Sequence, residues 1–206
     1  MKFKISTLFL IMLFVIASTQ LLAQTSDLDA DNKFYKLTRS APQKYIDGDK
    51  AGAAAEANEI LATAPSFRRS WNYGNAVHVA HLVLGRIAAD DGDISEAKRR
   101  LFESVTSLPY SFDTTKPLPW EEPIPEGRSK ASPQIDTFGP DMSLARVLLI
   151  KGEKAAVLKY LELCGKFWTL GDKQLAQWRE NIQAGEIPNF KANLVYFFPK
   201  ETSKEH

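Results

Sequence analysis

The sequence has little of several residue types on which small disulfide-stapled or metal-dependent proteins rely. Of its 206 residues, one is a cysteine and three are histidines. A single cysteine cannot form an internal disulfide, and a zinc motif of paired cysteines is excluded. The charges nearly cancel, with 26 Lys and Arg against 25 Asp and Glu. No basic field therefore favours nucleic acid or an anionic membrane surface, and the fold must depend on a hydrophobic core.

Several patterns that mark enzymes are also missing from the sequence. It has no glycine-rich loop that would cradle a phosphate and no glycine-flanked serine of the nucleophile-elbow type. From Asp27 to the C-terminal tail, the apolar residues recur with a helical period, and alternating strand-like runs are lacking. We therefore expect an all-α protein that needs no cofactor and is not an enzyme.

The N-terminus has the order of a secretory signal peptide. Lys2 and Lys4 precede the apolar run Leu8–Ala17, and Ala23 ends the segment. The run is too short to cross a bilayer, which takes about 20 apolar residues. Gln24 stands where a lipoprotein would carry its lipid-bearing cysteine. We expect residues 1–23 to be removed and residues 24–206 to form one soluble domain, periplasmic or extracellular.

The clearest helical pattern lies between His81 and Ser104. Leu84 is followed by the small Gly85, and Gly92 supplies a turn between two helical stretches. On the second stretch, Ala97 and Leu101 recur on one face. A small residue on each helix allows the two helices to pack closely, so the segment predicts a helical hairpin.

These residues resemble a tetratricopeptide repeat, which implies antiparallel helical hairpins stacked in a short array. The same spacing recurs around two other glycines, with weaker agreement downstream, where Val157 replaces a small residue and Thr169 replaces a proline. The residues in register are Ala41, Gly48, Ala53 and Pro65 upstream, and Leu144, Ala145, Gly152 and Leu161 downstream. The turn glycines lie farther apart than the about 34 residues of a regular array. The tract 138–145 also resembles a segment of uncharacterised bacterial tetratricopeptide-like proteins.

Three parts of the chain depart from this hairpin pattern. Pro42 falls inside the first predicted helix, which we expect either to kink there or to begin at Ser40. Residues 110–140 hold six of the eleven prolines and several aromatic residues, which predicts an irregular insertion lying across the helices, as a flap over a ligand or as a structural strap. Residues 172–198 predict a capping helix over 173–184, with Asp172 as its N-cap, and an extended tail over 189–198 that packs back on the helices.

The resemblance points to a candidate peptide-binding site. In tetratricopeptide units the first helix lines the concave face, and Arg86 and Arg146 occupy equivalent positions on first helices. Two arginines facing one groove would bind a carboxylate, such as a peptide C-terminus, by bidentate hydrogen bonds. On this hypothesis, Arg86→Ala weakens binding of an acidic peptide and leaves the fold intact. The alternative is that both arginines are solvated surface residues.

A second candidate site lies in the proline-rich insertion. Trp120 precedes Glu121 and Glu122, a combination that would suit a small ligand such as a sugar. Adjacent residues of an extended segment point to opposite sides, which is poor geometry for an acid and base that act on one bond.

Two further clusters have both a chemical and a structural interpretation. His78 and His81 are spaced to share a metal ion on one helix face, but core packing is favoured because further ligands are lacking. Asp90, Asp91 and Asp93 surround Gly92, where turn formation and helix capping are favoured over calcium binding. Cys164 is expected to be a buried, unreactive thiol.

The sequence thus favours an exported, tetratricopeptide-like binding or scaffolding module that contacts a protein or peptide in the cell envelope. The alternative is a small-ligand-binding or hydrolytic protein with its site near Trp120. A deep enclosed pocket would favour the alternative, whereas an open, shallow face would favour the binding module.

Overall fold

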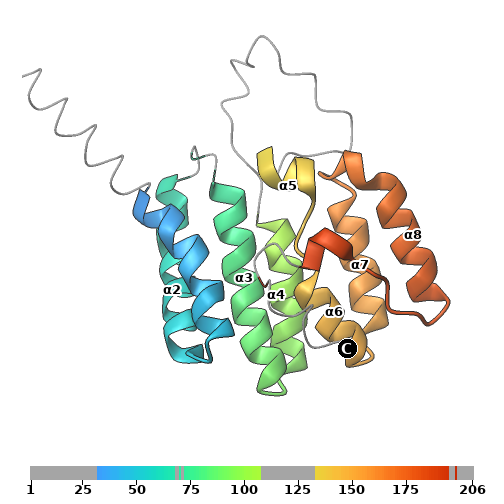
Figure 1. Ribbon diagram of the computed structural model, residues 1–206, viewed down its shortest axis with the longest axis horizontal. Helices are drawn as coiled ribbons and strands as arrows, with labels where there is room; N and C mark the ends of the chain where they lie inside the picture. The colour runs from blue at the N-terminus through green and yellow to red at the C-terminus, as the bar shows by residue number, and fades with distance from the viewer. Residues whose placement is uncertain (1–31, 68–69, 71, 108–132, 195–197, 199–206) are drawn as a thin grey trace, which may run out of the picture.

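The computed structural model describes residues 32–67, 70, 72–107, 133–194 and 198, and its regular elements are helical throughout these residues, which confirms the all-α prediction (Figure 1). A first helix covers residues 32–46. The elements that follow are α2 (Lys50–Thr63), η1 (Ala64–Phe67), α3 (Tyr73–Asp90), α4 (Ile94–Thr106), α5 (Pro133–Phe138), α6 (Ser143–Ile150), α7 (Lys154–Cys164), η2 (Thr169–Gly171), α8 (Asp172–Gln183) and η3 (Lys191–Leu194).

Three turns of the same construction join the helices 32–46 to α2, α3 to α4, and α6 to α7. Each is centred on a glycine with a left-handed backbone: φ is +91° at Gly48, +84° at Gly92 and +85° at Gly152. In each turn, the amide of the residue after the glycine donates to a carbonyl four residues before the glycine, at 2.8–2.9 Å. Glycine adopts this backbone without the strain that a side chain would add. The three glycines found in the sequence are therefore equivalent in structure.

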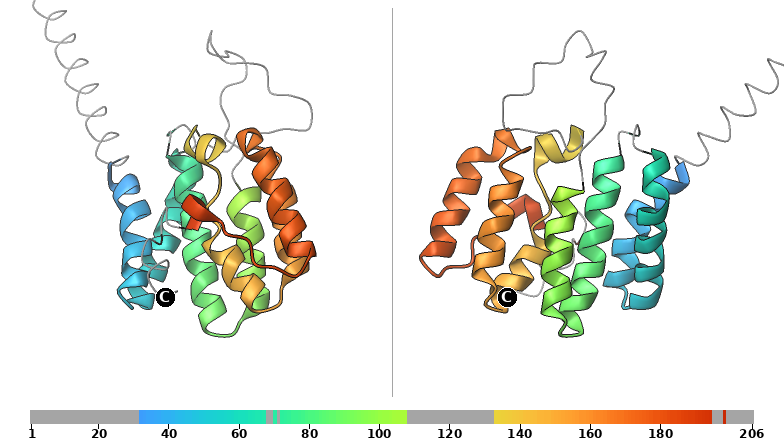
Figure 2. Two further views of the ribbon diagram at one scale, coloured as in Figure 1. Left: turned by 45° about the vertical axis from the view of Figure 1, so that its right-hand side comes forward. Right: turned by 180° about the vertical axis from the view of Figure 1, so that it is seen from behind.

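The long helices lie side by side and contact one another in sequence (Figures 1 and 2). α3 packs on α2 on one side and most extensively on α4 on the other, and α6 and α7 pack against α3 and α4. α8 packs on α7 at the far end. Polar contacts also join neighbouring helices. Lys98 of α4, for example, lies 2.8 Å from the carboxylate of Glu153 in the turn before α7.

Small residues allow the helices to approach at the core. A Cβ added to Gly85 would overlap the side chain of Leu144 on α6, so the absence of a side chain at Gly85 makes room for Leu144. Ala97 and Leu101 of α4 are completely buried. Val157, which takes the place of a small residue in the third helix pair, is also completely buried, so the larger side chain is accommodated within the core.

Three local expectations need correction, and one alternative is decided. The first helix runs through Pro42 over residues 32–46, so of the two alternatives the one that begins at Ser40 is excluded. Within the predicted irregular insertion 110–140, the segment Pro133–Phe138 is α5, whose Gln134 contacts the amide of Asn75 on α3. Proline suits a first helical position because the amide that it lacks would have no partner there.

The other two corrections concern the C-terminal part. Asp172 is the first residue of α8, and Gly171 is its N-cap. The tail is not extended throughout, because residues Lys191–Leu194 form the helical turn η3. The Asn189 Oδ1 accepts a hydrogen bond from the Lys191 amide at 2.9 Å, and Lys191 itself has a φ of 50°. This side-chain turn bends the chain where apolar content alone suggested a straight segment.

Candidate functional site

Arg86 lies on α3, six residues before Gly92, and it is a buried residue with 7% of its surface exposed. Its guanidinium carbon lies 5.2 Å from the ring centre of Tyr45 and 5.1 Å from that of Phe198. A guanidinium within about 6 Å of an aromatic centre is attracted by the negative face of the ring. The expectation of a solvated Arg86 is therefore wrong.

Tyr45 fixes the orientation of this arginine. Its hydroxyl accepts a hydrogen bond from Arg86 Nε at 3.3 Å and donates one to Asp90 Oδ2 at 3.0 Å. Asp90 also pairs with Lys50 at 3.1 Å. We name Tyr45, Arg86 and Asp90 the Arg86 subsite; it joins the helix 32–46 to α3. Burial raises the pKa of Tyr45 above its ordinary value of 10, so the phenol stays protonated and serves as a hydrogen-bonding group.

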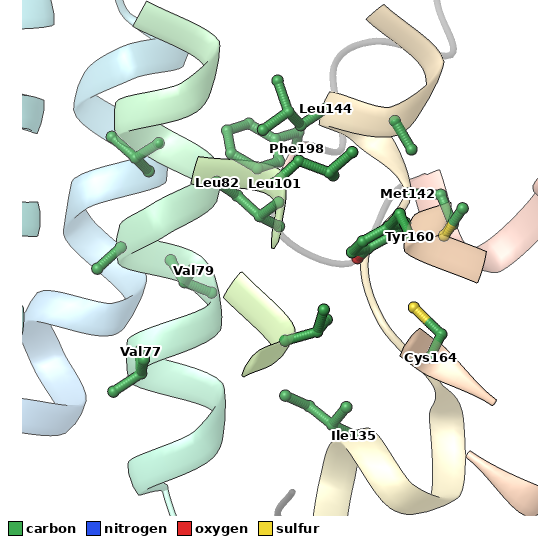
Figure 3. Close-up of a cluster of buried hydrophobic side chains, with 14 of the residues drawn as sticks. Val77, Val79, Leu82, Leu101, Ile135, Met142, Leu144, Tyr160, Cys164 and Phe198 are labelled. Carbon is green, nitrogen blue, oxygen red and sulfur yellow. The ribbon is translucent and has the colours of Figure 1, made fainter. Parts of the chain in front are cut away.

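The second ring of this arrangement comes from the C-terminal segment of the same chain. Phe198 is fully buried and belongs to the hydrophobic cluster that contains Leu82, Leu101 and Leu144 (Figure 3). Its ring meets that of Tyr45 edge-on, with 5.9 Å between the ring centres. Because Phe198 follows α8 by 15 residues of sequence, the chain returns from the far end of the molecule to the first helix pair.

Asn193 fixes the middle of this returning segment (the described residues 186–194 and Phe198, the C-terminal segment hereafter). Its main-chain carbonyl accepts a hydrogen bond from the Met142 amide at 2.7 Å. Its side-chain amide donates to the carbonyls of Phe138 and Pro140, at 3.0 and 2.9 Å. Closer to α8, the ring of Phe190 packs on Trp178 with 4.9 Å between centres. Figure 1 shows η3 and the chain after α8 lying over α6.

The burial of Arg86 corrects the mutational expectation. Removing the guanidinium would leave a void between two buried rings, so Arg86→Ala is destabilising and is not a neutral probe of binding. Arg146 occupies the equivalent position on α6 and is half-buried, which makes it the better probe. The two arginines thus lie on contacting helices, α3 and α6.

The alternative site near Trp120, Glu121 and Glu122 lies outside the described residues and stays a prediction. The predicted signal peptide over 1–23 and most of the proline-rich insertion also lie outside them, and both stay predictions.

His78 is completely buried and has a structural contact on each ring nitrogen. The Asp141 amide donates to Nε2 at 3.0 Å, so Nε2 is the acceptor and the proton is on Nδ1, which donates to the Ser104 carbonyl at 3.0 Å. Burial lowers the pKa of His78 from 6.5 to about 4. This histidine is neutral and ties α3 to α4 and to the start of α6, as the packing interpretation predicted.

His81 is also buried, one turn further along α3. Its Nδ1 lies 3.4 Å from both Arg100 Nη1 and Glu103 Oε2. Burial, together with the nearby Arg100, lowers its pKa to about 4. Over the residues that the structure describes, no group of histidine, cysteine and acidic side chains is arranged to hold a metal ion.

The remaining clusters take structural positions. Asp93 is the N-cap of α4 and accepts a hydrogen bond from the Glu96 amide at 3.0 Å, while Asp90 and Asp91 pair with Lys50. The turn interpretation of this acidic cluster is confirmed at Asp93.

Cys164 is a free, fully buried thiol whose pKa is raised far above its ordinary value by burial, which suppresses the reactive thiolate.

Sequence reasoning missed Tyr45 and Asn193 as site residues, and it assigned no role to Phe198. The apolar residues of the tail indicated that it packs back, but nothing in their pattern identified Arg86 as the contact. The position of Tyr45 could have indicated a role, because it lies three residues before Gly48, where the first helix reaches its turn.

No protein-family model, curated protein or solved structure matches this chain. In the part of the chain that the structure describes, none of the helices combines the length and the apolar character that a membrane crossing requires.

Proposed function

We propose that the mature chain is an exported, tetratricopeptide-like binding module whose first helices, 32–46, α3 and α6, present a face to an extended segment of a protein or peptide in the cell envelope. The equivalent turns at Gly48, Gly92 and Gly152 support the assignment of three hairpins to one repeat frame. The small, fully buried residues Ala41 and Ala145 occupy the position of Gly85 in that frame.

One observation carries the proposal. The chain's own C-terminal segment packs against these helices through two kinds of contact that peptide ligands also use, backbone hydrogen bonds and an inserted side chain. Asn193 exchanges main-chain and side-chain hydrogen bonds with residues 138–142, and Phe198 inserts a ring against the Arg86 subsite. A face that holds one such segment has the shape and polarity for another.

Binding is favoured over catalysis by the chemistry of the same residues. Tyr45 keeps its proton, Arg86 is a permanent cation, and Asp90 is held by Tyr45 and Lys50. These groups orient and hold a ligand; acid–base catalysis would call for a group that titrates near neutral pH.

The proposal is tested by selecting linear peptides from a random library on residues 24–206 and measuring their dissociation constants for two matched variants. Arg146→Ala removes a cation from α6 and is expected to weaken binding about tenfold, the loss typical of a contributing interface residue. Arg179→Ala removes the same side chain from the exposed side of α8 and is expected to change nothing. Equal affinities for the two variants, or a library that yields no binder, would contradict the proposal.

A further inference from the structure

We infer that the Arg86 subsite selects an aromatic side chain of its peptide partner, and that Phe198 occupies this subsite in the free protein, so the partner must displace the C-terminal segment. This inference rests on the proposed function and names both the chemistry of the partner and the regulation of the site.

The selectivity follows from the surfaces that surround the Phe198 ring. One side of the ring faces a guanidinium carbon at 5.1 Å, and its edge meets the Tyr45 ring, with 5.9 Å between centres. The cation attracts the negative face of a π system, and the edge-on pair has the geometry that aromatic quadrupoles prefer. An aliphatic side chain of the same volume fills the space but lacks both attractions. Aromatic residues are therefore the preferred occupants.

The hydrogen bonds of Tyr45 hold the subsite ready for such a ring. Arg86 Nε donates to the Tyr45 hydroxyl, which donates in turn to Asp90, so the positions of the guanidinium and the phenol are coupled. Asp90 is anchored by Lys50 of α2 at 3.1 Å. These contacts are made within the helices and do not involve Phe198. The binding geometry therefore remains after the ring is withdrawn.

The C-terminal segment competes because it belongs to the same chain. A tethered segment acts at an effective concentration in the millimolar range, so it masks the subsite from a free peptide that makes only equal contacts. Among the described residues of the segment, Phe190 packs on α8, Asn193 on the stretch before α6, and Phe198 on the Arg86 subsite. The anchors are separate, so the Phe198 end can leave while Phe190 keeps the segment attached.

The test uses a fluorescent peptide with the sequence of residues 189–200 and a protein that comprises residues 24–206. Phe198→Ala empties the subsite and is expected to bind this peptide at least tenfold more tightly than the wild type. Leu175→Ala removes a buried side chain from α8, outside the C-terminal segment and the subsite, and it should bind like the wild type. A peptide carrying Phe198→Ala should lose binding to the emptied protein. If Phe198→Ala fails to fold, Phe198→Leu preserves the apolar volume and should still bind the peptide more tightly than the wild type.

The outcomes separate this inference from the proposed function. Equal peptide binding by wild type, Phe198→Ala and Leu175→Ala would overturn masking by Phe198. Binding that does not depend on the peptide's own Phe198 would overturn the aromatic preference. If a library peptide binds with a dependence on Arg146 while the tail peptide binds no variant, the proposed function survives and this inference fails.

Discussion

At the scale of single residues, His78 shows how burial settles a question that spacing leaves open. Its separation from His81 suited either a shared metal or core packing. The structure gives each ring nitrogen of His78 a backbone partner, one 26 and the other 63 residues away in sequence. Contacts over such separations depend on how the helices assemble, so they could not be derived from local spacing. The sequence predicts that His78 packs in the core, but it does not predict which groups His78 contacts.

The neutrality of His78 predicts a pH dependence of stability. Its pKa is about 4 in the folded protein and 6.5 as the ordinary value, so the unfolded chain binds the extra proton first as the pH falls. The contribution of His78 is complete above pH 6.5 and is lost as the pH decreases towards 4, at a cost of about 3 kcal/mol. Chemical unfolding of wild type and His78→Gln at several pH values checks this: the stability difference between them should shrink by about that amount. Parallel pH curves would refute it.

Two buried serines predict opposite responses to the same substitution. Ser104 Oγ donates to the Leu101 carbonyl at 2.7 Å, whereas Ser143 Oγ, also buried, finds no hydrogen-bond partner within the described structure. Ser104→Ala should lower the free energy of unfolding by about 1 kcal/mol, and Ser143→Ala should leave it unchanged or raise it by up to about 1 kcal/mol. Urea unfolding of the pair measures both. A larger loss at Ser143 than at Ser104 would contradict the assignment.

At the scale of elements, the sequence predicted the helices and their turns where the signal is local. Gly48, Gly92 and Gly152 each end a helix with a left-handed backbone, a role that glycine fulfils through its own conformational freedom. The errors occur where tertiary contacts override local preference. For example, α5 forms inside a proline-rich stretch, where Gln134 reaches Asn75 on α3.

The close approach of α3 to α6 predicts a sharp difference between two glycines. Gly85→Ala places a methyl group against Leu144, which an already packed core resists at about 1–3 kcal/mol. Gly165 has a right-handed φ of −61°, and a methyl group there meets its nearest atom at 3.4 Å. Gly165→Ala should therefore be neutral or stabilise by about 0.4–1 kcal/mol. Thermal and urea unfolding of both variants decide the point, and equal destabilisation would show that the α3–α6 contact is looser than described.

At the scale of the whole molecule, one half of the candidate site was predictable. The predicted repeat frame identifies Arg86 and Arg146 as candidates because it depends only on local spacing in the sequence. Tyr45 lies 41 residues before Arg86, and Phe198 comes from the other end of the chain. Their convergence requires the first helix pair to pack on the second and the C-terminal segment to cross the array. No periodic pattern encodes that crossing.

The same long-range arrangement gives the tail, residues 189–198, a second role. As a sequence, residues 189–198 were too apolar to remain in solvent, so they were expected to pack somewhere. In the structure, Phe198 contacts Tyr45 and Arg86 on two of the predicted first helices, and Asn193 contacts residues 138–142 just before the third, α6. The tail is therefore part of the proposed binding site as well as part of the hydrophobic core.

Hydrogen–deuterium exchange of residues 24–206, with and without a selected peptide, tests the central claim that this face binds a peptide segment. The account predicts slower exchange in the helix 32–46, α3 and α6, faster exchange in the C-terminal segment as it is displaced, and no change in α8. Protection confined to α8 would contradict the claim, whereas protection of the helix 32–46, α3 and α6 with the C-terminal segment unchanged would contradict only its displacement.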